Sequence, residues 1–365
     1  MVDVDDSLRR ERAALRDWLA AHGASAEQIA ACELAAAERG REPEGLASDL
    51  VLDRGVSLTA RDLADRLGLD VADIIAIYRD LGVVVPDVDA AQFTDDDAML
   101  VTRLLRATSA GDIPSTTGAE LLRVVAGAMD RIAEAAVAIY VQGPEEDLRR
   151  RGASLVEHAE NTADATELVL HLGAGLAPVF RHHMRQAIAR QRVTQTGVTR
   201  RELARLTIGF LDLVGSTSLQ SQLDTAELAA QVTRFETRAF DVTSAGGGRL
   251  VKFIGDEIMV AALDPIAGCR VVLDLVEAFT DDGTQPRGGL VFGEVLFRHG
   301  DYYGPVVNLA ARLVDAAIPG EILVDSSVVE ASKDDGLCFD PAGRRLLKGF
   351  DDPVAVWSLI RVYPD

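Results

Sequence analysis

Apolar positions in the first half of the chain recur three, four or seven residues apart, which is the spacing of one face of a helix. Leu8, Leu15 and Leu19 show this spacing within the first 23 residues. Glycine and proline punctuate the later blocks, as expected at helix ends. Further helices are predicted at 26–38, 59–67, 71–80, 95–108, 116–142 and 145–172. We therefore expect an all-helical domain over residues 1–180.

The hydrophobic pattern changes after residue 205, where short apolar runs alternate with helical segments. The run RLTIGFLDLV predicts a strand, DTAELAAQVTRFETRAFDVTSAGG predicts a helix ending in glycines, and RLVKFIGDEIMVAAL predicts two strands around a tight turn. The remaining predicted elements are a helix at 266–279, a strand and loop at 287–298, a helix at about 305–316, and a strand within 321–330. This order is ferredoxin-like, with additions at the C-terminus, so residues 206–365 should form an α+β domain.

The segment between these two patterns, residues 181–205, is basic in an otherwise acidic chain. It holds seven arginines and one acidic residue, and VTQTG in its middle predicts a break between two helical pieces. We interpret it as a helical hinge between the domains. The alternative is a solvated basic helix, which is the common explanation of a run of charges.

Charge and cysteine content narrow the possible functions. The 365 residues carry a formal net charge of −21, which argues against a general nucleic-acid binder because phosphate contacts need clustered lysine and arginine. Three widely spaced cysteines argue against a disulfide framework and suit a reducing compartment. The charged N-terminus is unlike a signal peptide, and no apolar run reaches the roughly 18 residues of a membrane span. We expect a cytoplasmic protein.

Two aspartates stand where the predicted sheet could bring them together. Asp212 lies within the apolar run FLDLV, and Asp256 lies at the turn of the predicted hairpin. Neighbouring carboxylates repel unless a cation lies between them, and Mg²⁺ accepts such hard oxygen ligands together with substrate phosphates. The turn that follows, with Gly215, Ser216 and Thr217, would offer backbone N–H groups to those phosphates. Taken alone, Asp212 is better explained as a helix cap or hydrogen-bonded turn residue and Asp256 as a turn residue; the two together in this topology favour the metal site.

Three separated motifs, FLDLVGST, KFIGDEIM and GDYYGPVVNLAARL, resemble the signatures of class III nucleotidyl cyclases over roughly residues 204–362. Several motifs in the right order are more specific than any one of them. The resemblance implies conversion of ATP to 3′,5′-cyclic AMP and pyrophosphate in a homodimer whose active sites are shared between subunits. It also implies that Asp212 and Asp256 hold two Mg²⁺ or Mn²⁺ ions per active site.

The resemblance assigns the choice of base to Lys252 and Asp301. A lysine donates and an aspartate accepts, which matches the acceptor at N1 and the amino group of adenine. Guanine reverses both roles and would leave two polar groups mispaired, at about 1–3 kcal/mol each. A solvent-facing lysine and a loop acid are the alternatives, and so is a cyclase with relaxed base choice.

Further residues receive roles from the same resemblance. Asn308 would orient the ribose, and Arg312 would stabilise charge on the transferring phosphate; on a helix the two lie one turn apart on one face. Lys348 resembles a lysine that contacts the β- and γ-phosphates. The structural alternative is a helix-capping Asn308 and a surface ion pair of Arg312. A catalytically silent cyclase-like module is the competing function.

The helical half resembles the autoinhibitory module of actinobacterial pH-sensing adenylyl cyclases. If it regulates in this way, His182 and His183 in the basic hinge are candidate pH sensors, because histidine titrates between pH 5 and 8. Both could equally be ordinary helix-surface residues. A lipid or fatty-acid ligand of the helical domain is a further possibility.

A DNA-binding helix-turn-helix at 57–82 is the rival interpretation of this half. Its second helix carries Asp70, Asp73 and Asp80 against a lone Arg79. This face would repel phosphates, so we do not expect nucleic acid as a partner.

Overall fold

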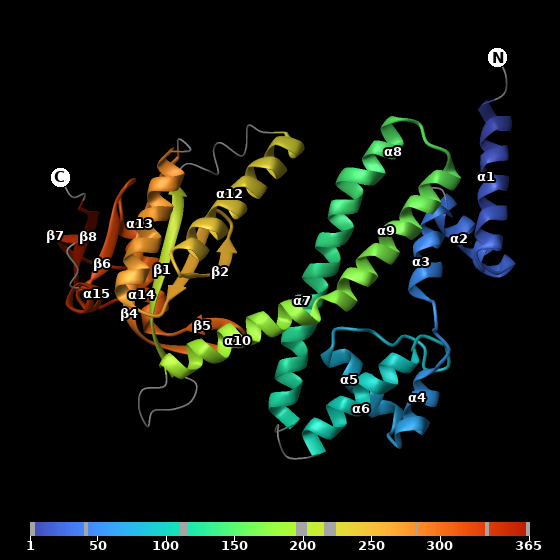
Figure 1. Ribbon diagram of the computed structural model, residues 1–365, viewed down its shortest axis with the longest axis horizontal. Coiled ribbons are helices and arrows are strands. Elements are labelled where there is room, and N and C mark those ends of the chain that lie inside the picture. Colours follow the sequence, from blue (N-terminus) through green and yellow to red (C-terminus); the bar gives the residue numbers. More distant parts are fainter. Residues whose placement is uncertain are drawn as a thin grey trace. The chain divides into compact units, whose positions relative to one another are not determined.

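The computed structural model describes residues 4–39, 43–109, 115–194, 203–214, 224–281, 284–332 and 336–362. The chain divides into two compact units, Met1–Arg181 and His182–Asp365. We call them the helical unit and the sheet unit; Figure 1 draws the first in blue to green and the second mainly in yellow to red. In the described part of the chain, no helix is long and apolar enough to span a membrane.

The helical unit contains helices and no strand among its described residues, as the hydrophobic pattern predicts. Its helices are α1 (Val4–Ala21), α2 (Ala26–Glu38), α3 (Leu46–Leu52), α4 (Ala60–Leu67), α5 (Val71–Asp80), α6 (Asp95–Ser109), α7 (Ser115–Tyr140), α8 (Glu146–Arg150) and α9 (Leu155–Gly175). The short helix α3 was not predicted. The helix predicted at 145–172 is in fact two, because Gly152 takes a positive φ of 65° and Ser154 begins α9 with a capping box.

Two separate clusters of buried side chains hold this unit together. One joins α1, α2, α3 and α9 around Leu15 and Leu19. The other joins α4, α5 and α6 around Leu63 and Ile74, with Phe93 closing it through a bridge to Leu58. Each cluster is small, so the packing of this unit is divided rather than continuous.

The sheet unit is built on one eight-stranded sheet with the order β2-β3-β1-β4-β6-β8-β7, and β5 pairs with β4. The strands are β1 (Leu203–Val214), β2 (Arg249–Ile254), β3 (Glu257–Ala262), β4 (Gln285–Arg298), β5 (Asp301–Tyr303), β6 (Ile322–Asp325), β7 (Leu337–Arg345) and β8 (Val354–Arg361). The first four in this order form the ferredoxin-like core, which confirms the predicted α+β class, and β7 and β8 are the C-terminal additions.

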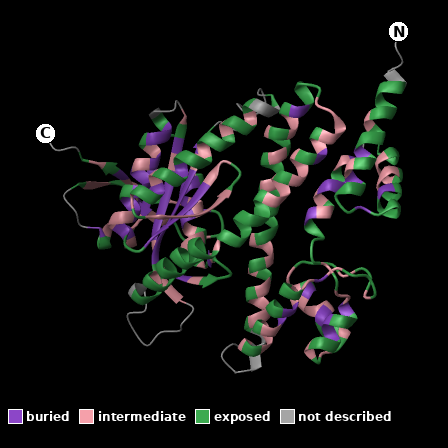
Figure 2. Ribbon diagram, turned by 45° about the vertical axis from the view of Figure 1, so that its right-hand side comes forward, coloured by how far each residue is buried: buried purple, intermediate pink, exposed green. Residues whose placement is uncertain are grey.

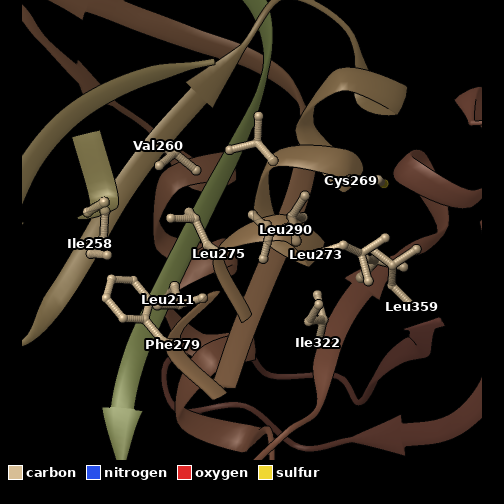
Figure 3. Packing of buried hydrophobic residues seen from close by; sticks show 14 of the residues in the cluster. Leu211, Ile258, Val260, Cys269, Leu273, Leu275, Phe279, Leu290, Ile322 and Leu359 are labelled. Carbon is tan, nitrogen blue, oxygen red and sulfur yellow. The ribbon is translucent and has the colours of Figure 1, made fainter. Parts of the chain in front are cut away.

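Helices cover both faces of this sheet. Helices α12 (Thr225–Ala245) and α13 (Pro265–Asp281) pack on one face, where Leu211 and Leu213 of β1 join the cluster drawn in Figure 3. Helix α14 (Pro305–Ala316) packs on the other, where Ile208 and Phe210 belong to a second cluster. Alternate side chains of a strand point to opposite faces, so Asp212 lies on the α14 face. Figure 2 shows the strands between the helix layers largely buried.

Two further α-helices, α15 and α10, belong to the described structure. Helix α15 (Ser326–Ala331) follows β6 directly, where the sequence predicted only a closing strand. Helix α10 (Ala177–Thr194) begins in the helical unit and continues into the sheet unit. Most of the predicted break at VTQTG lies in residues 195–202, outside the described residues. The boundaries 1–180, 181–205 and 206–365 therefore stay a prediction.

Candidate active site

Asp212 lies near the end of β1, between strands β3 and β4, and is half-buried. The strand register places it opposite Glu257 on one side and Arg287 on the other. The Arg287 guanidinium donates two hydrogen bonds to Asp212 Oδ2, from Nε at 2.9 Å and from Nη2 at 2.7 Å. An arginine is thus the first charge partner of this carboxylate, and explains how the strand accommodates it.

Asp256 follows Gly255 in the turn between β2 and β3, next to Glu257. Because Glu257 pairs with Asp212, the register brings all three carboxylates to the same end of the sheet. Burial, together with the charges of Asp212, Asp315 and Asp256, raises the pKa of Glu257 to about 7, against the opposing effect of Arg287. This end of the sheet therefore concentrates negative charge.

The donor set at this end fits a hard divalent cation. Both hydrogen bonds from Arg287 go to Oδ2 of Asp212, and no partner of Oδ1 is found among the described residues. Within the same described ranges, no group of three His, Cys, Asp or Glu residues has the arrangement of a complete metal cage. Two carboxylates suit Mg²⁺ or Mn²⁺, which would complete its coordination with waters and substrate phosphate oxygens.

Lys252 and Asp301 form an ion pair, with Nζ and Oδ2 2.5 Å apart. They come from β2 and β5, strands that do not pair with each other. Asp301 is oriented further because its Oδ1 accepts a hydrogen bond from the N–H of Tyr302. One end of the pair is a donor and the other an acceptor, and both remain partly exposed. The two residues that sequence reasoning assigned to base recognition are therefore in contact.

Helix α14 presents Asn308 and Arg312 one turn apart. Gly304, with φ 127°, precedes the helix, and Pro305 occupies its first turn, which fixes where it begins. Asn308 is exposed, and Arg312 Nη1 lies 2.7 Å from the exposed carboxylate of Asp315. An exposed pair of this kind contributes little to stability, so Arg312 is available to another anion.

Comparison with known proteins identifies the chain's family. Residues 2–191 match the family model described as adenylate cyclase regulatory domain. An uncharacterized protein of Mycobacterium tuberculosis is 37% identical over 96% of this chain and 90% of its own length. The pH-sensitive adenylate cyclase of M. tuberculosis is 30% identical over 98% and 90%, and an adenylate cyclase of Streptomyces coelicolor is 32% identical over 80% and 77%. The chain belongs to the adenylate cyclase family. It is an enzyme of the nucleotidyl cyclase type.

Arg287 lies in the candidate site beside Asp212, and sequence reasoning missed it. Besides Asp212, its Nη1 donates to the backbone oxygens of Asp315 and Ala317, at 3.3 and 3.4 Å. It therefore joins the Asp212 carboxylate to the C-terminal end of the helix that carries Arg312. A signal was present, because Arg287 is a charged residue at the start of the strand predicted at 287–298.

The other predicted site residues of the cyclase lie elsewhere. Lys348 is exposed after the buried Leu347, beyond β7. His182 and His183 are exposed on α10. Gly215, Ser216 and Thr217 lie outside the described residues. The described structure thus contains three local groups: the carboxylates, the Lys252–Asp301 ion pair and the α14 residues. The roles of these groups stay predictions.

Proposed function

We propose that the sheet unit converts ATP to 3′,5′-cyclic AMP and pyrophosphate. The observation that carries this proposal is the set of carboxylates at the end of β1, in which Asp212 is fixed by Arg287 next to the Asp256 turn. Carboxylates that are held close together and partly buried repel one another, which is unfavourable unless a cation binds between them. Such clusters are therefore typical of functional sites. Membership of the adenylate cyclase family supports the same reaction.

In this reaction the ribose 3′-oxygen attacks the α-phosphorus in line. The O3′–P bond forms, the bond to the bridging oxygen breaks, and pyrophosphate leaves with the electron pair while the 3′-hydroxyl proton passes to solvent. Asp212 and Asp256 would hold two Mg²⁺ or Mn²⁺ ions. When bound, these ions would lower the pKa of the 3′-hydroxyl and neutralise phosphate charge.

The chain's own side chains then position the substrate and stabilise charge. Arg312 would exchange its exposed partner Asp315 for the oxygens of the α-phosphate, which its planar fork matches. Asn308, one turn earlier on α14, would orient the ribose. Lys348 would contact the outer phosphates. Positioning and charge stabilisation are the main contributions in phosphoryl transfer, so no nucleophilic side chain is needed.

We further propose that the Lys252–Asp301 pair reads adenine. The two side chains already meet at 2.5 Å, so their polar ends are aligned before the base arrives. The base would insert between them, accepting from Lys252 and donating to Asp301. Guanine has a donor where adenine accepts and an acceptor where adenine donates, so the pair should favour ATP over GTP.

The active site is proposed to be completed by a second copy of the chain. Large apolar side chains are exposed beside the site residues: Ile254 is 48% exposed near Asp256, and Phe297 and Tyr303 are 45% and 47% exposed around Asp301. Exposed apolar groups clustered around polar site residues are typical of an interface. A homodimer with two shared sites would cover them.

The helical unit is proposed to regulate this reaction, with pH as a candidate signal. His182 and His183 are exposed on α10, between Arg181 and Arg185, so their protonation would add positive charge to an already basic stretch. Measuring activity against pH tests this version, and an unchanged profile in the His182→Ala, His183→Ala double variant would refute it. Nothing in the described residues or the comparisons supports a lipid or fatty-acid ligand.

The direct test is an assay of the purified full chain with ATP or GTP, in the presence of Mg²⁺ or Mn²⁺. We expect cyclic AMP from ATP, little product from GTP, and loss of activity in Asp256→Asn. The matched control is Asp264→Asn, which alters a helix-capping aspartate outside the candidate site. A folded wild-type chain that binds ATP without forming cyclic AMP would favour the silent module instead.

A further inference from the structure

A pocket lies in the sheet unit at the opposite end of β1 from the Asp212 and Asp256 carboxylates. Its volume is about 260 Å³, and α10, the start of β1, the α12–β2 turn, the end of β3 and β5 enclose it. Leu206 lines it, six residues before Asp212 on the same strand. At about 3.3 Å per residue the pocket is roughly 20 Å from the carboxylates. It is therefore separate from the carboxylates, although Tyr302, the neighbour of Asp301, lines it.

Two arginines from different elements line this pocket. Arg190 comes from α10 and Arg249 from the start of β2, and both are half-buried. Burial lowers the pKa of Arg190, and the charge of Arg249 lowers it further. This repulsion shows that the two cations interact electrostatically. None of the described residues that line the pocket is acidic. The pocket is thus positively charged, in contrast to the chain as a whole, which has a net charge of −21.

Arg249 is held in place by neutral groups. Its Nη1 donates to the hydroxyl of Tyr302 and its Nη2 to the backbone oxygen of Gly300, both at 2.9 Å. Its guanidinium carbon also lies 5.4 Å from the centre of the Tyr302 ring. These contacts fix the guanidinium without neutralising it, and leave further N–H donors for a ligand.

The rest of the wall suits a small ligand with one charged end. Gln186 adds a side-chain amide next to the arginines, while Ala189, Ala261 and Ala262 are small and apolar. An oxyanion between Arg190 and Arg249 would turn their mutual repulsion into two attractions. Arginine forks match the oxygens of phosphate and carboxylate groups, and a partly buried position strengthens such contacts.

We propose that this pocket binds a small oxyanion, a phosphate or a carboxylate, between Arg190 and Arg249. The bound anion would tie α10 to the sheet, because its two cationic partners lie on these two elements. Helix α10 also contains the end of the segment that matches the regulatory domain, residues 2–191. The site would therefore couple the level of an anion to the attachment of this helix. The proposal does not depend on the reaction proposed above.

The test is hydrogen exchange of the full chain in inorganic phosphate, compared with chloride at equal ionic strength. At a phosphate concentration of about ten times Kd, amides of α10 should exchange about tenfold more slowly. Acetate is the second probe: protection by both anions defines a general oxyanion site, and protection by phosphate alone defines a phosphate site. Equal protection by chloride, or none with either oxyanion, would overturn the proposal.

Variants of the two pocket arginines test whether phosphate protects α10 by binding in this pocket. Arg190→Gln and Arg249→Gln should each weaken phosphate protection by about tenfold or more in affinity. The control Arg185→Gln changes an exposed arginine of the same helix that does not line the pocket, and should keep the protection. Arg249→Lys keeps the charge without the fork, and serves if Arg249→Gln does not fold. Protection of α14 in every variant would report phosphate at the candidate active site separately. Undiminished α10 protection in Arg190→Gln contradicts the proposal.

Discussion

The two units of this cyclase bury their apolar side chains in different ways. The sheet unit packs apolar side chains on both faces of one sheet, so its two clusters share the same strands. The helical unit relies on two separate clusters and leaves a row of large side chains exposed along α7. This row consists of Leu121, Val125, Met129 and Ile132, at helical spacing.

The difference indicates what each unit is suited to do. A sheet packed on both faces allows little adjustment, so it can hold carboxylates, an ion pair and a helix in fixed register. Helices joined by small clusters leave apolar surface that further contacts can cover. This contrast agrees with the proposal that the sheet unit carries the reaction and the helical unit regulates it, and the following changes test this division.

The largest effect is expected from Arg312→Ala in the sheet unit. Loss of the arginine that we propose stabilises the transferring phosphate should lower kcat by about 10³-fold with a small change in the KM for ATP. Steady-state cyclic AMP assays measure this effect, with Arg270→Ala on α13 as the control. If kcat fell by less than tenfold, Arg312 would not serve the transition state.

The packing of α14 gives the next largest effect. A Cβ on Gly289 would come within 2.6 Å of the Ala310 oxygen and 2.7 Å of the Val314 nitrogen, so α14 must shift. Gly289→Ala should lower the free energy of unfolding by about 1–3 kcal/mol and reduce activity by displacing Arg312.

The matched change in the helical unit is Gly127→Ala in α7, where the nearest atom to a new Cβ is 3.8 Å away. It should raise stability by about 0.5–1 kcal/mol, because alanine favours a helix interior. Urea unfolding of both variants tests the contrast. Equal effects of the two substitutions would remove the distinction between a tightly packed and an adjustable unit.

Base selection should give a smaller change. Asp301→Asn keeps the size of the side chain but replaces a pure acceptor by an amide that also donates. We expect the preference for ATP over GTP, measured as the ratio of kcat/KM values, to fall by about tenfold. An unaltered ratio would show that the Lys252–Asp301 contact is only structural.

The smallest expected effect is a change in how the free energy of unfolding depends on pH. Burial raises the pKa of Asp325, which caps α15 by accepting from the N–H of Val328. The ionised form is therefore disfavoured in the folded state, and this penalty grows as pH rises from about 4 through the raised pKa. Asp325→Asn keeps the cap and removes the charge. Its unfolding free energy relative to wild type should rise from pH 4 to pH 8; a difference independent of pH would exclude this origin.

Local patterns predicted much of this fold. The helix at 305–316 agrees with α14 because its periodicity and Pro305 are signals within one short segment. The ferredoxin-like order followed from the sequence of strands and helices alone. The family motifs named Lys252 and Asp301 before the structure showed their contact.

Long-range pairing was harder to predict. The partnership of Arg287 with Asp212 joins positions 75 residues apart, and only the strand register reveals it. The pocket between Arg190 and Arg249 likewise depends on where α10 packs. The break between α8 and α9 was not predicted either. The apolar pattern continues through it, although α8 ends before Gly152 and α9 begins after Ser154.

The central claim is that two chains share each active site around the Asp212 and Asp256 carboxylates, and mixing inactive chains tests it most directly. In the shared site that we propose, one chain contributes Asp212 and Asp256 and its partner contributes Asn308 and Arg312. Asp212→Ala and Asn308→Ala then alter opposite halves of each site, so each homodimer should be inactive. Mixed in equal amounts under exchange, the two variants should recover about one quarter of wild-type activity, because half of the dimers carry one intact site. No recovery, with subunit exchange verified independently, would contradict the account.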